Sequence, residues 1–140
     1  MQTELKFSLA RTVSVDEFRS LLLRSTLSAR RPVDDLDCFR GMLDNSDIVA
    51  TCWSKNLLIG IARSITDFSY CCYLSDLAVD VNFQKQGIGT QLISLTQSML
   101  GPHCKIILLS APAAVEYYRH IGFEPHSSAW ILPSNRKVSG

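Results

Sequence analysis

The residues best suited to chemistry in this sequence form a short polar loop with two glycines, Gln84-Lys85-Gln86-Gly87-Ile88-Gly89. The loop follows an apolar run and opens directly into a helical pattern. Backbone N–H groups at such a junction converge on one point, where the positive end of the helix dipole also lies, and this favours an anion such as phosphate. Thr90 adds a hydroxyl and Lys85 a positive charge. The loop therefore predicts a phosphate-bearing ligand.

Three known phosphate-binding patterns compete for this loop. The triphosphate pattern G-x-x-x-x-G-K-[ST] fails because no Lys-Ser or Lys-Thr follows Gly89. The dinucleotide pattern G-x-G-x-x-G fails because its third glycine would fall on Leu92 and its acidic residue near Leu108. The third pattern, Gln84-x-x-Gly87-x-Gly89, fits as it stands. The structural alternative is a simple tight turn before a helix.

The elements before the loop place it at the end of a sheet. Period-2 alternation predicts a first strand, and apolar residues at helical spacing predict two helices after it, the first capped by Ser14 or Asp16. Three β-rich runs follow and indicate an antiparallel meander. The predicted ranges are 5–12 for the strand, 15–23 and 36–43 for the helices, and 48–53, 57–66 and 70–80 for the meander.

After the loop the pattern changes to helix, strand, helix and a last strand or hairpin. The predicted ranges are 90–100, 106–109, 112–122 and 123–132. Strand, helix and strand in immediate succession form a right-handed parallel crossover. The fold class is therefore α/β (α+β), with a mixed central sheet that is antiparallel except for one parallel pair and is flanked by four helices. Its length predicts one domain over 1–140.

Two motifs at a fixed separation resemble those of one family. The loop with its preceding Leu77-Ala78-Val79-Asp80 resembles the Gln/Arg-x-x-Gly-x-Gly/Ala signature of the GCN5-related N-acetyltransferase (GNAT) family. The run from Tyr118 to Gly122-Phe123 resembles the end of that family's later helix, Tyr-x-x-x-Gly-Phe. The resemblance covers the whole chain, since the predicted order of elements is also the family's order. It implies a parallel pair of strands splayed around coenzyme A.

The resemblance implies acetyl-CoA as co-substrate and assigns residues to it. Loop amides would hold the pyrophosphate, and the strand before the loop would pair with the pantetheine arm. Glycine at 87 and 89 avoids a Cβ that would obstruct the phosphates or forbid a positive φ. The implied cofactor-binding residues are Leu77, Ala78, Val79, Gln84, Lys85, Gln86, Gly87, Ile88, Gly89, Thr90 and Tyr118.

Acetyl transfer needs a neutral amine to attack the thioester and a proton for the departing thiolate. By position in its motif, Tyr118 matches the family's tyrosine that protonates the sulfur; a core aromatic is the alternative. Asp76 is the best-placed carboxylate for a base, and a hydrogen-bonding anchor is its equal alternative. A water chain, which Tyr70 or Tyr73 could join, would remove the need for a dedicated base.

Composition limits the partners. A net charge of +1 offers no field for nucleic acid, and no apolar run approaches the ~20 residues of a membrane span. The N-terminal residues lack a signal-peptide pattern, so we expect a cytoplasmic protein. The five cysteines include no C-x-x-C pair, so neither a disulfide framework nor a metal site is expected.

These observations predict an acetyl-CoA-dependent N-acetyltransferase that acts on the primary amine of a small molecule by direct attack in a ternary complex. The alternatives are acetylation of protein N-termini or lysines, and a regulatory module that binds acetyl-CoA without turnover. Arg30 and Arg31 could hold an anionic group of the acceptor, or lie in an ordinary surface loop. A homodimer is compatible with the resemblance, since dimers are common in the family.

Overall fold

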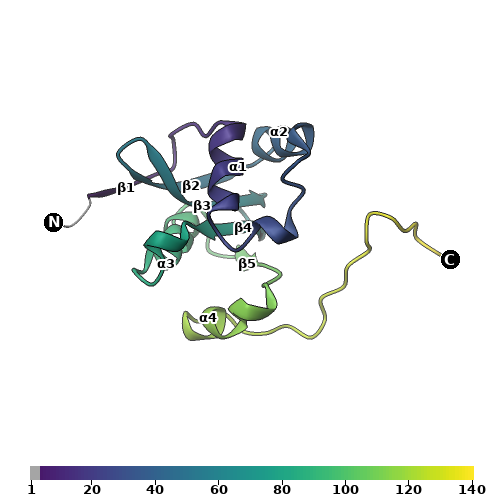
Figure 1. The fold of residues 1–140 in the computed structure, drawn as a ribbon. Helices are drawn as coiled ribbons and strands as arrows, with labels where there is room; N and C mark the ends of the chain where they lie inside the picture. Colours follow the sequence, from purple (N-terminus) through teal and green to yellow (C-terminus); the bar gives the residue numbers. More distant parts are fainter. Residues whose placement is uncertain (1–3) are drawn as a thin grey trace. The chain divides into compact units, whose positions relative to one another are not determined.

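The structure, a computed structural model, describes residues 4–140 (Figure 1). The chain divides into two compact units, one ending at Leu109 and one beginning at Ser110. The elements of the first unit are β1 (Leu5–Ser8), α1 (Val15–Leu23), the 3₁₀ turn η1 (Ser28–Arg30), α2 (Leu36–Asp44), β2 (Ile48–Ser54), β3 (Leu57–Thr66), β4 (Cys71–Val79), the 3₁₀ turn η2 (Val81–Phe83), α3 (Ile88–Gln97) and β5 (Lys105–Ile107).

The first two helices begin where the sequence supplies side-chain caps. Ser14 Oγ accepts a hydrogen bond from the Glu17 amide at 3.0 Å, and Glu17 Oε1 accepts one from the Ser14 amide at 3.0 Å. This reciprocal capping box confirms Ser14, rather than Asp16, as the cap of α1. Asp35 caps α2 by accepting from the Cys38 amide at 3.0 Å.

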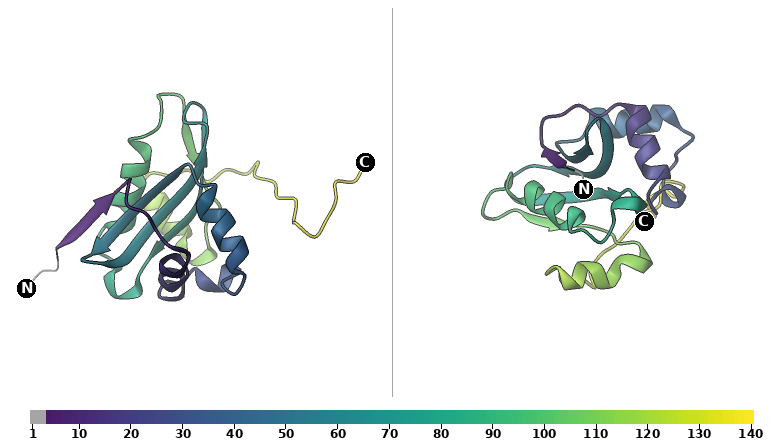
Figure 2. Two further views of the ribbon diagram at one scale, coloured as in Figure 1. Left: turned by 90° about the horizontal axis from the view of Figure 1, so that it is seen from above. Right: turned by 60° about the vertical axis from the view of Figure 1, so that its left-hand side comes forward.

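Within residues 4–109, five strands form one sheet in the order β1-β2-β3-β4-β5 (Figure 2). All neighbouring strands are antiparallel except β4 and β5, whose parallel pairing follows the crossover through α3. The predicted mixed sheet with one parallel pair is confirmed. That pair is short, because only Cys71–Tyr73 of β4 have partners on β5, in Lys105–Ile107.

Adjacent residues of β3 show how the two faces of the sheet are covered. Ile61 points into the core beneath α1 and α2, where the Phe18 and Phe39 rings lie 5.1 Å apart. Gly60 points to the other face, toward Ile88 and Leu92 of α3. Figure 2 shows α3 covering that face of the sheet. A Cβ on Gly60 would lie 3.1 Å from the side chains of both Ile88 and Leu92, so glycine lets α3 approach the sheet closely.

The second unit contains one short helix. A 3₁₀ turn, η3 (Pro112–Ala114), leads into α4 (Val115–His120). The strand or hairpin predicted over 123–132 is wrong, because residues 121–140 form no strand. A strand needs a neighbour for its backbone hydrogen bonds, and 110–140 contains no second strand; Pro125 and Pro133 also lack an amide donor.

Other element boundaries differ by a few residues for identifiable reasons. The first strand ends at Ser8 rather than at 12, since Ser8 Oγ accepts the Ala10 and Arg11 amides in a turn. Helix α3 begins at Ile88, two residues early, because Gly87 starts it and Ile88 is buried. No helix among residues 4–140 has the length and apolar character that crossing a membrane requires.

Candidate active site

Asp80 fixes the start of the glycine loop. Its side chain is 3% exposed and forms an ion pair with Arg24, the residue that ends α1. The Asp80 carboxylate also accepts the Asn82 amide at 2.9 Å, and its own amide donates to Ile59 O at 2.8 Å. Arg24 in turn donates to Leu58 O at 2.9 Å and accepts from the Val81 amide at 2.9 Å. The loop is therefore held to α1 and β3 before its first glycine.

The loop reaches α3 through two left-handed residues. Lys85 has φ 65° and Gly87 has φ 79°, while the Gln84 side-chain amide donates back to Val79 O at 3.1 Å. Gly87 is the N-cap of α3, and no side chain caps that end. No described atom lies within 4 Å of a Cβ built on Gly87, so the space beside it is open. The predicted positive φ is confirmed at this glycine.

The residues after Gly87 divide into inward and outward positions. The Ile88 side chain is buried at 3% exposure, so only its backbone faces the loop. The Gly89 φ is not positive, because Gly89 lies within the helix; the expectation of a positive φ therefore fails there, and only close approach remains as a reason for glycine. The N–H groups in the first turn of a helix point out of its N-terminal end. The hydrogen bonds within α3 begin with the Gln91 amide, which donates to Gly87 O at 3.1 Å.

The β4 edge next to this loop has no strand beside it. Pairing with β5 stops at Tyr73, so Leu74 and Asp76–Val79 pair with β3 alone. The bond from the Asp80 amide to Ile59 O sets the alternation of the ladder, which turns the Ala78 backbone toward Ile61 of β3. The backbone groups of Leu77 and Val79 then point toward the open edge. Leu77 offers its backbone there and Val79 its amide, since Val79 O accepts from the Gln84 side chain at 3.1 Å.

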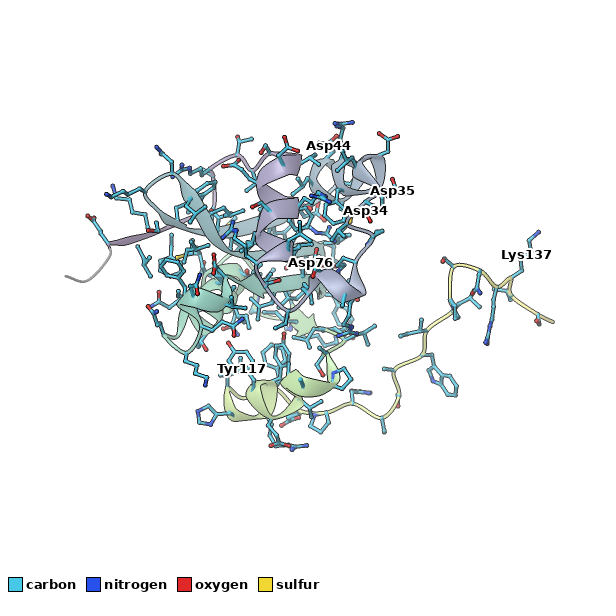
Figure 3. All side chains as sticks on the ribbon, in the orientation of Figure 1. Asp34, Asp35, Asp44, Asp76, Tyr117 and Lys137 are labelled. Atoms are coloured by element: carbon cyan, nitrogen blue, oxygen red, sulfur yellow. The ribbon has the colours of Figure 1, made fainter. Side chains whose placement is uncertain are left out.

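Asp76 lies inside the first unit, between two arginines. Its side chain has no exposed area, and it accepts from Arg31 Nε at 2.6 Å and from Arg63 Nε at 2.6 Å. Figure 3 shows Asp76 at the sheet, whereas Asp34, Asp35 and Asp44 belong to the outer helical segments and are exposed. Both Asp76 carboxylate oxygens are thus engaged by cations.

These contacts bear on the two roles considered for Asp76. A base must accept a proton, and a carboxylate with two charge-assisted hydrogen bonds would lose them by doing so. The contacts favour the anchoring role. Catalysis by Asp76 stays a prediction that a bound acceptor would have to test.

Tyr118 lies at the end of α4, within a complete Schellman cap. The Phe123 amide donates to Tyr118 O at 2.9 Å, and the Gly122 amide donates to Arg119 O at 3.2 Å. Gly122 has φ 104°, which L side chains rarely adopt. The Phe123 ring packs against the Tyr118 ring with centroids 5.5 Å apart. The spacing Tyr-x-x-x-Gly-Phe is therefore that of a helix cap which fixes the tyrosine.

The environment of Tyr118 keeps its hydroxyl protonated. Burial raises the pKa of Tyr118 above 10.0, and the neighbouring Tyr117 raises it further. The two rings meet edge to face at 5.2 Å, with Tyr117 on α4 in Figure 3. A neutral phenol is a donor, which is the state that a proton-donating residue needs.

The structure brings together most of the predicted residues within the first unit. Asp76 through Thr90 form one continuous path from β4 to α3, whereas Tyr118 belongs to the unit that begins at Ser110. Sequence reasoning missed Arg24, Arg63 and Gly60, which support this path from a distance. The sequence shows only that the two arginines are charged and that the glycine is small, and neither property identifies a contact partner.

Within residues 4–140, no three His, Cys, Asp or Glu side chains are grouped so that they could hold a metal ion. The cysteines are free thiols. Burial raises the pKa of Cys52 to about 11, so this thiol stays neutral.

The geometry fits coenzyme A in two respects. An open space and outward amides lie beside Gly87, where a pyrophosphate would need close approach to the backbone. The unpaired edge of β4 offers backbone groups to an extended arm.

A family model described as an acetyltransferase (GNAT) domain matches residues 27–131. Among curated proteins, the N-acetyltransferase ycf52 of Gracilaria tenuistipitata var. liui, named as uncharacterized, is 32% identical over 87 residues, which are 58% of this chain and 48% of that protein. Histone acetyltransferase TAP1 of Glycine max is 34% identical over 111 residues, 68% of this chain and 46% of that protein. The chain thus spans about half the length of these curated relatives.

Solved structures share the fold at low identity. A GNAT family acetyltransferase from Streptococcus pneumoniae TIGR4 matches with a TM-score of 0.78 at 18% identity, covering 96% of this chain and 100% of that one. The aminoglycoside N-acetyltransferase AAC(6')-Iy, solved in complex with CoA, matches with a TM-score of 0.73 at 16% identity, covering 97% of this chain and 98% of that one.

Proposed function

The chain belongs to the GCN5-related N-acetyltransferase family, and from this premise we propose that it transfers the acetyl group of acetyl-CoA to the primary amine of a small molecule. The proposal has the amine attack the thioester directly, in a ternary complex. The observation that carries it is the open edge of β4 leading into the Gly87 turn and the outward amides of α3. Those features supply, in order, a backbone for an extended arm and donors for a pyrophosphate.

The chain's own residues would hold the co-substrate as follows. Leu77 and Val79 offer backbone groups at the open edge, and the amides after Gly87 meet the phosphates. Lys85 and Gln86 are exposed on the loop, where Lys85 would balance phosphate charge. Coenzyme A, when bound, supplies the activated acetyl group as a thioester.

Tyr118 is proposed as the residue that donates a proton to the departing sulfur. A free thiol has a pKa near 8.5, so a thiolate leaves more readily when a donor is close. Because burial holds the Tyr118 pKa above its ordinary value, the phenol keeps its proton throughout the neutral range. Its cap fixes the ring through Phe123.

The amine must lose a proton as well. Asp76 is one candidate to accept it, but both of its oxygens already bind guanidinium groups. We therefore favour transfer to water, with Asp76 as the anchor of the neighbouring backbone. This choice predicts that Asp76→Asn changes the pH dependence of kcat/KM little. If Asp76 were the base, the same substitution would remove the acidic limb of the pH profile.

A protein acceptor is the second candidate, because a relative from Glycine max is named a histone acetyltransferase. Small amines are preferred because structural neighbours include aminoglycoside acetyltransferases. The third candidate function is a module that binds acetyl-CoA without turnover. A cytoplasmic location and a homodimer belong to the same proposal; a chloroplastic relative from Arabidopsis thaliana leaves location to be tested by fusion to a fluorescent protein.

Calorimetry with coenzyme A, followed by thiol release with a panel of small amines and a histone peptide, tests the proposal. We expect binding, and transfer to at least one small amine. Tyr118→Phe is expected to lower kcat about 10²- to 10⁴-fold and to change coenzyme A affinity little. Absence of binding contradicts the co-substrate, transfer to the peptide alone favours the second candidate, and binding without any transfer favours the third.

A further inference from the structure

One cluster of buried charges contains two arginines that have no part in the function proposed above. It consists of Arg31, Arg63, Asp76 and Ser75, and we call it the arginine clamp. Arg31 directly follows η1, Arg63 belongs to β3, and the other two residues belong to β4. The clamp thus joins the connection between α1 and α2 to the middle of the sheet.

Arg31 uses its whole guanidinium in this cluster. Its Nε donates to Asp76 Oδ1 at 2.6 Å, its Nη2 to Ser75 O at 2.7 Å and its Nη1 to Arg30 O at 2.9 Å. Each of its three nitrogens donates to a different oxygen, which suits the fixed fork of arginine and not the single ammonium of lysine. The Arg31 side chain keeps 20% exposure, whereas the Arg63 side chain keeps 4%.

The second arginine, Arg63, contacts both β4 residues of the clamp and the end of α2. Arg63 donates from Nε to Asp76 Oδ2 at 2.6 Å and from Nη2 to Ser75 Oγ at 3.0 Å. Its Nη1 reaches the end of α2, at Met42 O and Ser46 Oγ, both at 3.2 Å. Asp76 therefore has two cations and no free oxygen, and Arg31 is the more exposed of the two arginines.

The clamp grips β4 at an irregular point. The register with β3 passes from Arg63↔Asp76 to Ser64↔Leu74, so Ser75 is an extra residue, a β-bulge. Two residues before it, Tyr73 is the last of β4 to pair with β5. Two residues after it, Leu77 begins the backbone proposed to meet the pantetheine arm. Arg31 thus holds a carbonyl of β4 that lies two residues beyond the last pair with β5.

We propose that Arg31 is a positioning residue: by tying the end of η1 to the β4 bulge, it sets where the acceptor amine meets the thioester. The proposal rests on the function proposed above, with the thioester of bound coenzyme A lying where β4 and β5 separate. Arg31 itself touches neither reactant; it acts through Ser75 and through the backbone of η1.

Amide hydrogen exchange tests the tie without requiring activity. In Arg31→Gln, exchange in residues 28–33 and 74–77 is expected to speed up about tenfold, because three hydrogen bonds from a cation are lost, two of which join these segments. Exchange in β2 and α3 is expected to stay unchanged. The matched control is Arg40→Gln, since Arg40 is an exposed residue of α2 paired only with Asp37. Unchanged exchange at both segments overturns the proposal, even if the protein proves to be an active enzyme.

Kinetics tests the consequence. Arg31→Gln is expected to lower kcat about 10- to 100-fold while the KM for acetyl-CoA stays within about twofold, as a small misplacement of a reactant would. Arg31→Lys keeps the charge without the planar guanidinium. Its log kcat is expected to recover less than half of the decrease seen in Arg31→Gln. Full recovery by lysine, or a lowered melting temperature with unchanged kcat, overturns positioning. If the wild type acetylates no amine, the proposed function fails, and the exchange result alone decides whether Arg31 forms the tie.

Discussion

The two sequence motifs both use a left-handed glycine at a helix end, but they are supported in different ways. Gly87 opens α3, and its loop depends on residues far away in sequence: Asp80 pairs with Arg24, 56 positions earlier. Gly122 closes α4, and each hydrogen bond of its cap joins residues no more than five positions apart. The first motif is built by tertiary contacts and the second by local ones.

This difference shows what each motif requires. In the proposed function the α3 loop offers backbone amides to a phosphate; no side chain caps the helix, and the loop is held through the strand before it. The α4 cap must hold one ring, and a Schellman turn with its own apolar contact is sufficient. Substitutions in the loop support should therefore reduce the stability of the whole first unit, and substitutions in the cap should act on α4.

Asp80→Ala should have the largest effect. Removal of the carboxylate leaves Arg24 without its partner and frees the Asn82 amide. We expect the free energy of unfolding to fall by about 3 kcal/mol, the lower end for a broken buried pair, because the Arg24 side chain keeps 29% exposure. Urea unfolding of the full chain measures it.

Asp34→Ala is the matched control for this prediction. Asp34 also pairs with an arginine, Arg19, at 3.2 Å, but its side chain is 92% exposed. A change of less than about 1 kcal/mol is expected there. Equal losses in the two variants would contradict the view that burial of Asp80 supports the loop.

Gly87→Ala and Gly122→Ala compare the two glycines directly. A Cβ at positive φ costs about 1–2 kcal/mol. In Gly87→Ala this cost should lower the unfolding free energy reported by the buried Trp53, and coenzyme A affinity should fall. In Gly122→Ala the Trp53 signal should stay unchanged and amide exchange in α4 should speed up. Trp130→Phe provides the background, because Trp130 is 93% exposed and would add its own fluorescence.

Gly41→Ala separates backbone strain from the mere addition of a methyl group. Gly41 lies inside α2 and has no described atom within 4 Å of a built Cβ. Alanine is expected to stabilise this helix by about 0.5–1 kcal/mol. A loss here similar to that of Gly87→Ala would mean that the sign of φ is not the cause.

The same contrast explains what the sequence could predict. Local features were accessible: the Ser14 cap, the positive φ of Gly87 and the β3–β4 meander follow from residue types within a few positions. Partners 45 positions apart, such as Arg31 and Asp76, were not, because charge alone does not choose among many arginines. Arg31 was expected to face a substrate anion or solvent, and its guanidinium instead binds the protein's own carboxylate.

The wrong strand over 123–132 has a related cause. The run from Ala129 to Leu132 has the apolar character of a strand, yet Trp130 and Ile131 are 93% and 67% exposed. Apolar patterning predicts a strand only where a neighbouring strand is available, and no property of these residues supplies one. Strand pairing depends on two segments, so the pattern of one segment alone cannot predict it.

The smallest predicted effect concerns the pKa of Tyr118, and it tests whether the local cap is sufficient. Burial raises this pKa above 10.0, so the folded state favours the neutral phenol. The resulting contribution to stability is complete below the unfolded pKa near 10 and is lost as pH rises through the higher folded pKa. The difference in phenolate absorbance between the wild type and Tyr118→Phe gives the curve. Phe123→Ala removes the ring 5.5 Å away and should move its midpoint back toward 10. A midpoint that stays raised without Phe123 would mean that contacts outside the cap bury Tyr118, and that the second motif, like the first, depends on distant parts of the chain.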